Sequence, residues 1–390
     1  MENKGTNNNL NDFREQIDRI DEQLVDLFTK RMQIASEIAQ LKKASGIPVL
    51  DAKRERELLS RIEKLSGPDF GTYSKSLYET IMALSRSYQH KLFDGKGVTA
   101  GLVESALADT PLLFPESAKV ACQGVEGAYS QHAAEKLFAN PEITYYPSFE
   151  GVYDAVEKGT CLYGVLPLEN STTGSVRDVY DLLCRKSGDP LFIVRSLRLR
   201  VEHSLLIKKD ASVKDVRKII SHDQALSQSA NFLKNTFPDA IINRSANTAI
   251  AAQAVAASDG TVAALASPDC ASQYGLKIAM SDVQDNKNNY TRFICISKKL
   301  EIYPGAQKTS IVLTTAHKPG SLSRVLSRIN AWGINLSKLE SRPIPGHDFE
   351  FMFYFDLDCP VYSPRLGPFL TEMEQNSEQF RYLGTYTEML

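Results

Sequence analysis

The sequence lacks the cysteine spacing that builds metal sites and disulfide frameworks. It contains six cysteines in 390 residues, and no two of them form a Cys-x-x-Cys pair. Zinc sites and disulfide-rich secreted domains both depend on regular spacing, so neither class is indicated. We expect reduced thiols, mostly buried, and no metal ion.

Long apolar runs and an excess of one charge are also missing. No run approaches the roughly 18 apolar residues of a membrane span, and the first ten residues are polar and rich in asparagine. The 45 basic and 47 acidic residues nearly cancel, which argues against binding to nucleic acid or to a membrane. We therefore expect a cytoplasmic protein, and its length predicts two or three domains.

A nucleotide-binding fingerprint is absent as well. A strand predicted over 119–123 leads into Gly124-x-x-Gly127 and a helix that opens at Ala128. This string lacks the third glycine of dinucleotide loops and the Gly-Lys-Ser/Thr of phosphate loops. A nicotinamide-dependent dehydrogenase is therefore not indicated, and we expect no organic cofactor. The amides at such a helix start can still bind a carboxylate.

The first feature that is present is a helical region over 10–93. Residues 10–45 contain no proline or glycine, and apolar residues recur there at helical spacing, which predicts one long helix. A second helix is expected over about 52–65, capped by Asp51, and a third over about 74–92. Three such helices cannot enclose a sizeable core alone, so we expect an interlocked dimer of helical bundles.

The charges of the long helix have a definite geometry. Arg31 and Lys42 are eleven residues apart, about three turns, so they share one face and can bracket one small ligand. Arg14 lies roughly 100° away from Arg31 around the helix, so a partner chain would have to supply it to the same ligand. The plain alternative is that each of these charges is a solvated surface residue.

The polar residues of this region resemble those of the all-helical chorismate mutases. The most specific string is Asp-Ala-Lys-Arg-Glu-Arg at residues 51–56. The resemblance implies an active pocket for a dianionic substrate, with one arginine donated across a dimer. The positions it assigns to that pocket are Arg14, Arg31, Lys42, Asp51, Arg54, Glu55, Ser85 and Gln89.

The same resemblance implies a role for most of these residues. Arg14 and Arg31 would clamp the two carboxylates of chorismate. Lys42 and Gln89 would bind the ether oxygen whose bond breaks, and Glu55 would hold the ring hydroxyl. A pericyclic rearrangement needs no nucleophile and no acid, only a cage that favours the compact conformer and the charge developing on oxygen.

A linker is expected over 94–117, followed by alternating strands and helices over 118–299. The loop Leu168–Ser175 contains seven consecutive hydrogen-bonding or backbone-permissive residues, more than a strand-to-helix turn needs. A second set of strands and helices begins with a strand predicted over 198–208. Two α/β lobes with a cleft between them are the expected result.

Two further strings carry candidate site residues. His222 opens a predicted helix beside Ser221 and Gln224; alone it would be a capping or core histidine, but in this company it is a candidate site residue. The string 289–293 puts a hydroxyl, Thr291, and a guanidinium, Arg292, at the mouth of a strand predicted to run to Ser297. Arg292 would hold a carboxylate, or brace the hinge towards the following domain.

Together these strings resemble prephenate dehydratase over about 119–299. The resemblance rests on Gly124 and Gly127 with Tyr129-Ser130, on the Pro-x-Glu-Asn-Ser loop at 167–171, on Ser221-His222-x-Gln224 and on Thr291-Arg292-Phe293. It implies that Thr291 is the proton donor. The residues implied to surround the substrate are Asn170, Ser171, Thr172, Ser221, His222, Gln224, Gln228, Arg292 and Phe293.

Residues 308–390 are predicted to follow the order βαββαβ, a ferredoxin-like layout. The expected elements are strands over 309–314, 334–340, 349–356 and near 382–385, with helices over 322–332 and 366–377. This region resembles the ACT domain, a sensor of small molecules. The strings that resemble a phenylalanine site comprise Gly320, Ser321 and Leu322, with Glu340, Ser341 and Arg342. Ser321 and Ser323 depart from the apolar residues often found in the first string, and a purely structural dimer module is the alternative.

The resulting hypothesis is a bifunctional, multidomain enzyme. It would convert chorismate to prephenate and prephenate to phenylpyruvate with loss of CO₂ and water, would be inhibited by phenylalanine, and would assemble as a homodimer or homotetramer. One alternative is a dehydratase whose helical region only dimerises. A second is a non-catalytic, two-lobed binding protein with a sensor domain.

Overall fold

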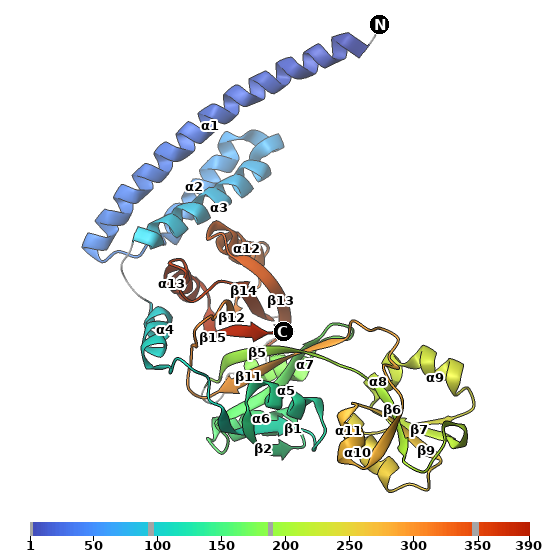
Figure 1. Ribbon diagram of the computed structural model, residues 1–390. Coiled ribbons are helices and arrows are strands. Elements are labelled where there is room, and N and C mark those ends of the chain that lie inside the picture. The colour runs from blue at the N-terminus through green and yellow to red at the C-terminus, as the bar shows by residue number, and fades with distance from the viewer. Residues whose placement is uncertain (1–2, 93–96, 186–189, 345–350) are drawn as a thin grey trace. The chain divides into compact units, whose positions relative to one another are not determined.

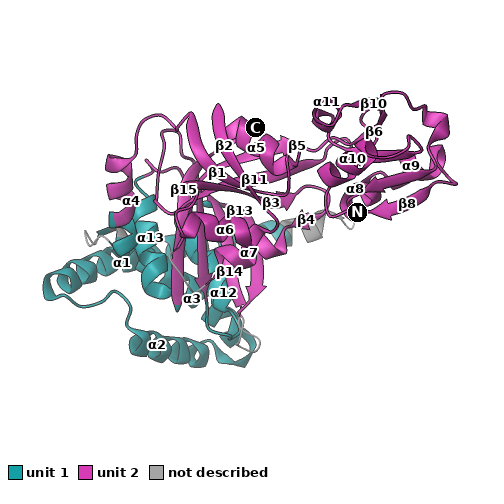
Figure 2. Ribbon diagram, turned by 90° about the horizontal axis from the view of Figure 1, so that it is seen from below, with its two compact units in different colours: residues 1–101, 315–335, 364–378 teal, residues 102–314, 336–363, 379–390 magenta. Residues whose placement is uncertain are grey.

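The computed structural model describes residues 3–92, 97–185, 190–344 and 351–390 (Figure 1). The chain divides into two compact units, coloured separately in Figure 2. Unit 1 comprises Met1–Gly101, Thr315–Asn335 and Pro364–Glu378, and unit 2 comprises Leu102–Thr314, Leu336–Ser363 and Gln379–Leu390. Residues 93–96, at the start of the expected linker, and Phe349, at the start of an expected strand, lie outside the described residues.

Unit 1 is helical. Its helices are α1 (Asn3–Ser45), α2 (Ala52–Leu65), α3 (Gly67–Leu92), α12 (Ser321–Ala331) and α13 (Leu366–Asn376). The expected linker contains a further helix, α4 (Val98–Asp109), which continues into unit 2. In the described part of the chain, no helix combines the length and the apolar character of a membrane span.

The boundaries of α2 and α3 follow from their end residues. The Asp51 carboxylate accepts a hydrogen bond from the backbone N–H of Arg54 at 3.0 Å and caps α2, as predicted. Helix α3 begins at Gly67, a full turn or more before the expected start. Pro68 does not prevent this, because the first turn of a helix does not use the N–H that proline lacks.

A buried polar cluster joins α3 to the two helices from the C-terminal region. Glu372 of α13 is fully buried and accepts hydrogen bonds from the indole of Trp332 at 2.7 Å and from the Ser87 hydroxyl at 3.0 Å. Burial raises the pKa of the Glu372 carboxyl. Beside it, Arg86 forms an ion pair with Glu55 of α2. These contacts fix the face of α3 on which Arg86 and Ser87 lie.

The larger lobe of unit 2 is built on a ten-stranded sheet. The strand order is β13-β14-β12-β15-β5-β11-β3-β1-β2, with β4 paired to β3. The strands are β1 (Ser117–Gln123), β2 (Asn140–Tyr146), β3 (Tyr163–Asn170), β4 (Gly174–Ser175), β5 (Phe192–Arg200), β11 (Tyr290–Ser297), β12 (Lys308–Thr314), β13 (Asn335–Pro343), β14 (Phe351–Asp358) and β15 (Gln379–Met389).

Three helices accompany the N-terminal half of this sheet. They are α5 (Tyr129–Leu137), α6 (Phe149–Glu157) and α7 (Arg177–Leu183). The core between these helices and the strands is apolar and includes Val152, Leu166 and Ile294, each fully buried. All six cysteines are buried, and none of them forms a disulfide.

The smaller lobe is built on a five-stranded sheet in the order β10-β6-β9-β7-β8. Its strands are β6 (Ser204–Lys208), β7 (Lys218–Ser221), β8 (Ile241–Arg244), β9 (Val262–Ala266) and β10 (Leu276–Met280). The helices are η1 (Val213–Asp215), α8 (Asp223–Gln228), α9 (Ala230–Thr236), α10 (Thr248–Ala256) and α11 (Asp269–Gln273).

Three of the predicted elements of unit 2 differ from the structure. The single strand expected over 198–208 is two strands, because the chain leaves the large sheet after Arg200 and enters the small sheet at Ser204. The helix predicted to open at His222 is interrupted at Ser229 and forms two short helices, α8 and α9. The loop expected from Leu168 begins only after Asn170, because β3 keeps its pairing with β11 to that residue.

The C-terminal region follows the predicted element order β12-α12-β13-β14-α13-β15. Its four strands lie in the order β13-β14-β12-β15, with β12 antiparallel to both of its neighbours. Strand β15 also pairs in parallel with β5, so this sheet continues into that of the larger lobe. At Gly384 a Cβ atom would lie 2.2 Å from the Ile193 carbonyl oxygen, so only glycine fits there.

Candidate active site

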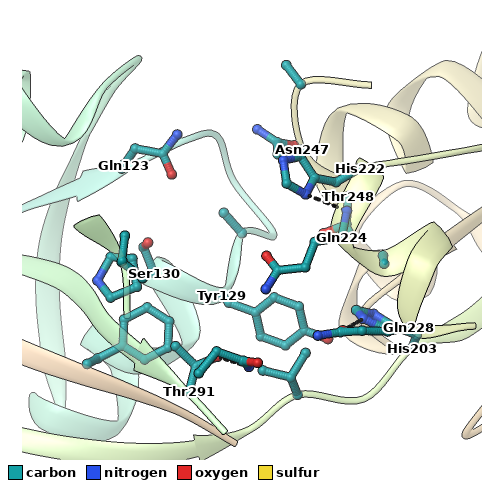
Figure 3. A pocket seen from close by; sticks show the side chains of 18 of the residues that line it. Gln123, Tyr129, Ser130, His203, His222, Gln224, Gln228, Asn247, Thr248 and Thr291 are labelled. Atoms are coloured by element: carbon teal, nitrogen blue, oxygen red, sulfur yellow. Dashed lines mark hydrogen bonds between the residues drawn. The ribbon is translucent and has the colours of Figure 1, made fainter. Parts of the chain in front are cut away.

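A cleft of about 410 Å³ lies between the two lobes of unit 2 (Figure 3). Residues of β1, β3, α5 and β11 line it from the larger lobe, and residues of α8 and α10 line it from the smaller lobe. Six of the residues that the sequence pointed to are brought together here: Asn170, His222, Gln224, Gln228, Thr291 and Phe293.

Thr291 belongs to the first residue pair between the antiparallel strands β11 and β3. Its partner in this pair is Asn170, and the Thr291 hydroxyl oxygen accepts a hydrogen bond of 3.0 Å from the Asn170 Nδ2. Because that lone pair is engaged, the hydroxyl hydrogen of Thr291 is available to a group in the cleft. The side chain is buried in the wall of the cleft.

The orientation of the Asn170 amide is fixed by its surroundings. Its Oδ1 accepts hydrogen bonds from the backbone N–H groups of Thr172 and Thr173, both at 2.9 Å, and from the Thr173 hydroxyl at 3.1 Å. Since those two N–H groups can only donate, the oxygen must face them. The Nδ2 therefore faces Thr291 and the Asn289 Oδ1, which lies 2.7 Å away.

A chain of amides continues from Asn170 across the cleft. The Asn289 Nδ2 donates to the Gln228 Oε1 at 3.0 Å, and the His203 Nε2 lies 2.9 Å from the same oxygen. Because that oxygen only accepts, Nε2 carries the hydrogen of the His203 ring. Burial lowers the pKa of His203, so the ring is neutral at neutral pH.

Several cleft residues were not assigned to the site by the sequence. They are Gln123, Tyr129, Ser130, His203, Asn247 and Thr248. Tyr129 and Ser130 belong to one of the strings that resemble prephenate dehydratase. Asn247 could have been found as a helix cap, because it is the N-cap of α10 and its side chain accepts a hydrogen bond from the Ile250 N–H at 2.7 Å. His203 had none, because it lies in the crossing between β5 and β6 that the sequence had merged into one strand.

Three predicted residues support the cleft rather than line it. The Ser171 hydroxyl donates to the Asn288 carbonyl at 2.9 Å and accepts from Tyr290 N at 2.9 Å. The Thr172 hydroxyl lies 3.4 Å from the Asn289 Oδ1. The fully buried Ser221 hydroxyl donates to the Leu265 carbonyl at 2.6 Å. Each bond holds a loop or a strand end beside the cleft.

The expected contact of Arg292 with a ligand in this cleft is not what the geometry provides. Successive side chains of a strand point to opposite faces, so Arg292 lies behind the cleft that Thr291 and Phe293 line. Its guanidinium forms an ion pair with Asp356 of β14, lies 2.9 Å from Glu388 of β15, and donates to the Tyr386 hydroxyl at 2.8 Å. The second reading of Arg292, as a brace towards the following domain, fits these contacts.

Those partners also determine the charge of Arg292. Burial lowers the pKa of the guanidinium, but the neighbouring Tyr386 and Asp356 outweigh this effect, and the pKa lies above its usual value. Arg292 therefore stays protonated, and its charge is neutralised within the network rather than offered to a ligand.

Polar and apolar side chains both line the cleft. Among the described residues that line it, none is Lys, Arg, Asp or Glu. Two helices of nine residues begin at it, α5 after Ala128 and α10 after Asn247. No side chain caps α5. Helix N-termini attract anions through their backbone N–H groups and dipoles, so the site can hold carboxylates without forming ion pairs.

The eight polar residues of the helical region lie on α1, α2 and α3 or at their ends. Arg14 and Arg54 are exposed, and the Arg14 Nη1 lies 3.5 Å from the Asn11 Oδ1. The Lys42 ammonium donates to the Val49 carbonyl at 2.6 Å. Asp51 is the cap of α2 and Glu55 the partner of Arg86.

Two of these eight residues each have one buried side-chain atom without a hydrogen-bond partner among the described residues. These atoms are the Arg31 Nη1 and the Gln89 Oε1. The amide nitrogen of Gln89, by contrast, donates to the Ser85 hydroxyl at 3.3 Å. Burying a polar atom without a partner is costly, so both atoms are positions where a polar ligand would supply the missing hydrogen bond.

The residues expected to bind an effector are divided between the two units. Gly320, in the left-handed conformation, precedes α12, where Ser321 accepts from Arg324 at 2.8 Å and Leu322 follows in the first turn. On β13, Ser341 is exposed, whereas its neighbours Glu340 and Arg342 both form side-chain hydrogen bonds. Glu340 accepts from the Ser175 hydroxyl at 2.6 Å, and Arg342 makes two bonds of 2.7 Å to Asp181.

Comparison with known proteins identifies similar sequences and folds. The family model for chorismate mutase type II matches residues 13–90, and the one for prephenate dehydratase matches residues 120–301. The bifunctional chorismate mutase/prephenate dehydratase of Escherichia coli (strain K12) is 30% identical over 383 residues, which cover 96% of this chain and 95% of that protein.

Two solved structures each resemble about two thirds of this chain. The prephenate dehydratase of Arthrobacter aurescens in complex with L-Phe is 26% identical with a TM-score of 0.64, and the match covers 69% of this chain and 90% of that one. A protein described as GqqA, a novel type of quorum-quenching acylase, is 30% identical with a TM-score of 0.62, over 68% of this chain and 97% of that one.

Proposed function

This chain belongs to the family of bifunctional chorismate mutase/prephenate dehydratases, and we propose that it converts chorismate to prephenate in its helical region and prephenate to phenylpyruvate in the cleft of unit 2. The observation that carries the dehydratase assignment is the buried hydroxyl of Thr291, held by Asn170 at the wall of an uncharged cleft.

In the dehydratase reaction, the bond between the ring and its carboxylate breaks and CO₂ leaves. The electron pair of that bond enters the ring, and the hydroxyl at the opposite ring carbon leaves with its own bonding pair. Thr291 hydrogen-bonds to the departing hydroxyl and helps it to leave as water, and Thr291 takes its proton back from solvent. A weak acid suffices, because the product gains an aromatic ring.

The uncharged wall of the cleft favours the loss of CO₂. An ion pair would stabilise the ring carboxylate in the ground state and so oppose decarboxylation. The backbone N–H groups at the starts of α5 and α10 can hold the side-chain carboxylate of prephenate at the other end of the substrate. Asn170, the Asn289 to Gln228 bond and His203 then keep the two lobes in register around the bound molecule.

For the mutase reaction, the buried polar atoms of α1 and α3 support the same pocket that the resemblance implies. The unpaired Arg31 Nη1 would donate to a carboxylate of chorismate. Lys42 would donate to the ether oxygen, for which it exchanges its bond to the Val49 carbonyl. The unpaired Gln89 Oε1 marks a second polar contact near the substrate.

The assembly we propose is a dimer through α1. Its apolar side chains are exposed in the single chain: Phe13 to 60%, Leu27 to 62% and Leu41 to 69%. An apolar stripe of this length is characteristic of a helix that is covered by a partner. A second copy of α1 would cover it and would bring its own Arg14 to the pocket of the first chain.

Mixed dimers test whether Arg14 is donated across the interface. Subunits with Arg14→Ala and with Lys42→Ala are each expected to lose mutase activity. In a heterodimer one pocket receives both changes and the other receives neither, so purified heterodimers should show about half of the wild-type rate. Mutase turnover of heterodimers purified on two different tags is the measurement. If heterodimers are as inactive as either parent, Arg14 acts within its own chain.

We also propose that β12 to β15 with α12 and α13 form an ACT domain that binds phenylalanine. The element order and the strand order β13-β14-β12-β15 support this, as does the L-Phe complex of the similar Arthrobacter structure. Gly320 to Leu322 and Glu340 to Arg342 are the proposed effector residues. Inhibition would then act through the contacts that Glu340 and Arg342 of β13 make with Ser175 and Asp181.

One assay tests the whole proposal. Purified protein is given chorismate, and both prephenate and phenylpyruvate are followed, with and without phenylalanine. We expect both products to appear in turn and phenylalanine to lower the formation of phenylpyruvate. A chain that leaves chorismate untouched but consumes added prephenate would be a dehydratase with a helical dimerisation region. A chain that turns over neither would be a binding protein.

A further inference from the structure

The short hairpin between β3 and β4 carries Asn170 and separates two cavities. Glu169 pairs with Ser175 and Asn170 with Gly174 across the hairpin. Asn170 faces the cleft of 410 Å³. Glu169 and Ser171, its neighbours along the chain, face a second cavity of 590 Å³ behind the hairpin.

Strand β11 separates the same two cavities by the same alternation. Thr291 and Phe293 line the cleft, whereas Tyr290 and Arg292 line the second cavity. The described residues that line the second cavity are all different from those of the cleft. A side chain in the second cavity therefore has no direct contact with a ligand in the cleft, and it can influence the reaction through the elements between the two cavities, β3, β4 and β11.

Lys338 of β13 reaches the hairpin from this second cavity. Its ammonium lies 2.7 Å from the Glu169 Oε1 and 3.0 Å from the Ser175 Oγ. The Ser175 hydroxyl donates its hydrogen to the Glu340 Oε2 at 2.6 Å, and that carboxylate lies 3.8 Å from Lys338. One lysine thus holds both residues of the pair at which the hairpin closes.

These contacts are strong enough to matter for the geometry of the loop. The Lys338 side chain is only 19% exposed, and bonds between charged groups strengthen as water is excluded. Strand β4 is only two residues long and pairs at two positions, so the strand ladder itself closes the hairpin with few bonds. Gly174, at φ 82°, and the three residues before it form a loop around the Asn170 amide.

We propose that Lys338 is a positioning residue for the dehydratase reaction, which clamps the β3 to β4 hairpin through Glu169 and Ser175 and thereby holds the Asn170 amide that orients Thr291. The proposal rests on the dehydratase function proposed above. It places a residue of the C-terminal sheet in direct support of the catalytic hydroxyl, with no contact to substrate.

A positioning role predicts which kinetic constant changes. Without the clamp the hairpin still forms the wall of the cleft, so prephenate binds nearly as before. The Thr291 hydroxyl, however, loses its fixed direction towards the leaving group, and misplacement of this kind costs up to about 100-fold in rate. Loss of the clamp should therefore lower kcat of the dehydratase reaction and leave KM for prephenate little changed.

The test compares three variants of the full chain. Lys338→Met removes the charge and keeps the side-chain stem; Lys338→Arg keeps donors for both Glu169 and Ser175. Lys308→Met is the matched control, because Lys308 lines the same cavity and is 13% exposed but bonds to Ser337 and Asp358 instead of the hairpin. Steady-state kinetics with prephenate and mutase turnover with chorismate are measured for each.

We expect Lys338→Met to lower the dehydratase kcat about 10-fold to 100-fold, Lys338→Arg to restore most of it, and Lys308→Met to leave it near wild type. Mutase activity should be unchanged throughout, and a KM for prephenate near that of the wild type shows that unit 2 is folded. An unchanged kcat in Lys338→Met, a rise in KM alone, or an equal loss in Lys308→Met would overturn the proposal. If wild-type protein shows no dehydratase activity, the proposed function fails instead.

A second variant decides the matter if Lys338→Met does not fold. Glu169→Gln removes the same ion pair from the hairpin side and should lower kcat to a similar extent. In the double variant the two losses should not add, because both changes break one interaction. Fully additive losses, or a normal kcat in Glu169→Gln, would show that Lys338 does not act through the hairpin.

Discussion

Replacing Thr291 with valine is expected to lower the dehydratase kcat/KM by about 10²-fold to 10⁴-fold, the usual contribution of a positioned proton donor. Valine keeps the shape and burial of threonine and removes only the hydroxyl. Asn170 is not left unpaired, because its Nδ2 retains the Asn289 Oδ1 at 2.7 Å and the Tyr290 carbonyl at 3.3 Å. The loss would therefore report on the hydroxyl itself, as phenylpyruvate formation from added prephenate.

Two comparisons make this result specific. Thr291→Ser keeps a hydroxyl at the same position and should retain a much larger part of the activity than Thr291→Val. Mutase activity on chorismate should be the same in both, because the residues proposed for that reaction lie on α1, α2 and α3. Equal loss of the two activities would contradict separate sites, and a fully active Thr291→Val would remove Thr291 from the mechanism.

Replacing Lys42 with alanine is expected to have the opposite pattern. The charge that develops on the ether oxygen of chorismate loses its donor, and removal of one such donor costs about 10²-fold to 10³-fold in rate. Prephenate formation should fall by that factor, while turnover of added prephenate should continue at the wild-type rate. Following both reactions on the same preparation shows that the chain is intact.

Lys30→Ala is the matched control for the loss of a lysine from α1. Lys30 is exposed and pairs with Asp26 at 2.7 Å, one turn earlier on the same helix. Exposed pairs of this kind contribute little, about 0 to 1 kcal/mol, so this variant should keep both activities. Undiminished mutase turnover in Lys42→Ala would exclude the role at the ether oxygen and favour a helical region that serves only for dimerisation.

The parts of the site that the sequence predicted are those carried by continuous strings. Asn170, His222 and Gln224 lie in short runs of polar residues between apolar elements, where polar side chains beyond the needs of a turn indicate a binding function. Asp51 is similar, because a cap requires only residues near it in the sequence. Local signals of this kind do not depend on how the lobes come together.

The parts that the sequence did not predict depend on pairing between distant segments. His203 reaches the cleft because the chain changes sheets between Arg200 and Ser204, and an apolar run does not reveal which sheet it joins. Arg292 stands beside Thr291 in the sequence, yet it faces the opposite side of β11. Strand alternation alone would have predicted that opposition, but the partners Asp356 and Glu388 come from a part of the chain that only the folded sheet brings near.

The pairing of β15 with β5 bears on how the chain folds as it is made. Strand β5 leaves the ribosome long before its neighbour β15, whose Thr387 pairs with Arg195. Until then one edge of the central sheet stays open, and open edges invite pairing with the wrong chain. Contacts so distant in sequence also slow folding. We therefore expect the nascent larger lobe to expose this edge until β15, its last strand, is added.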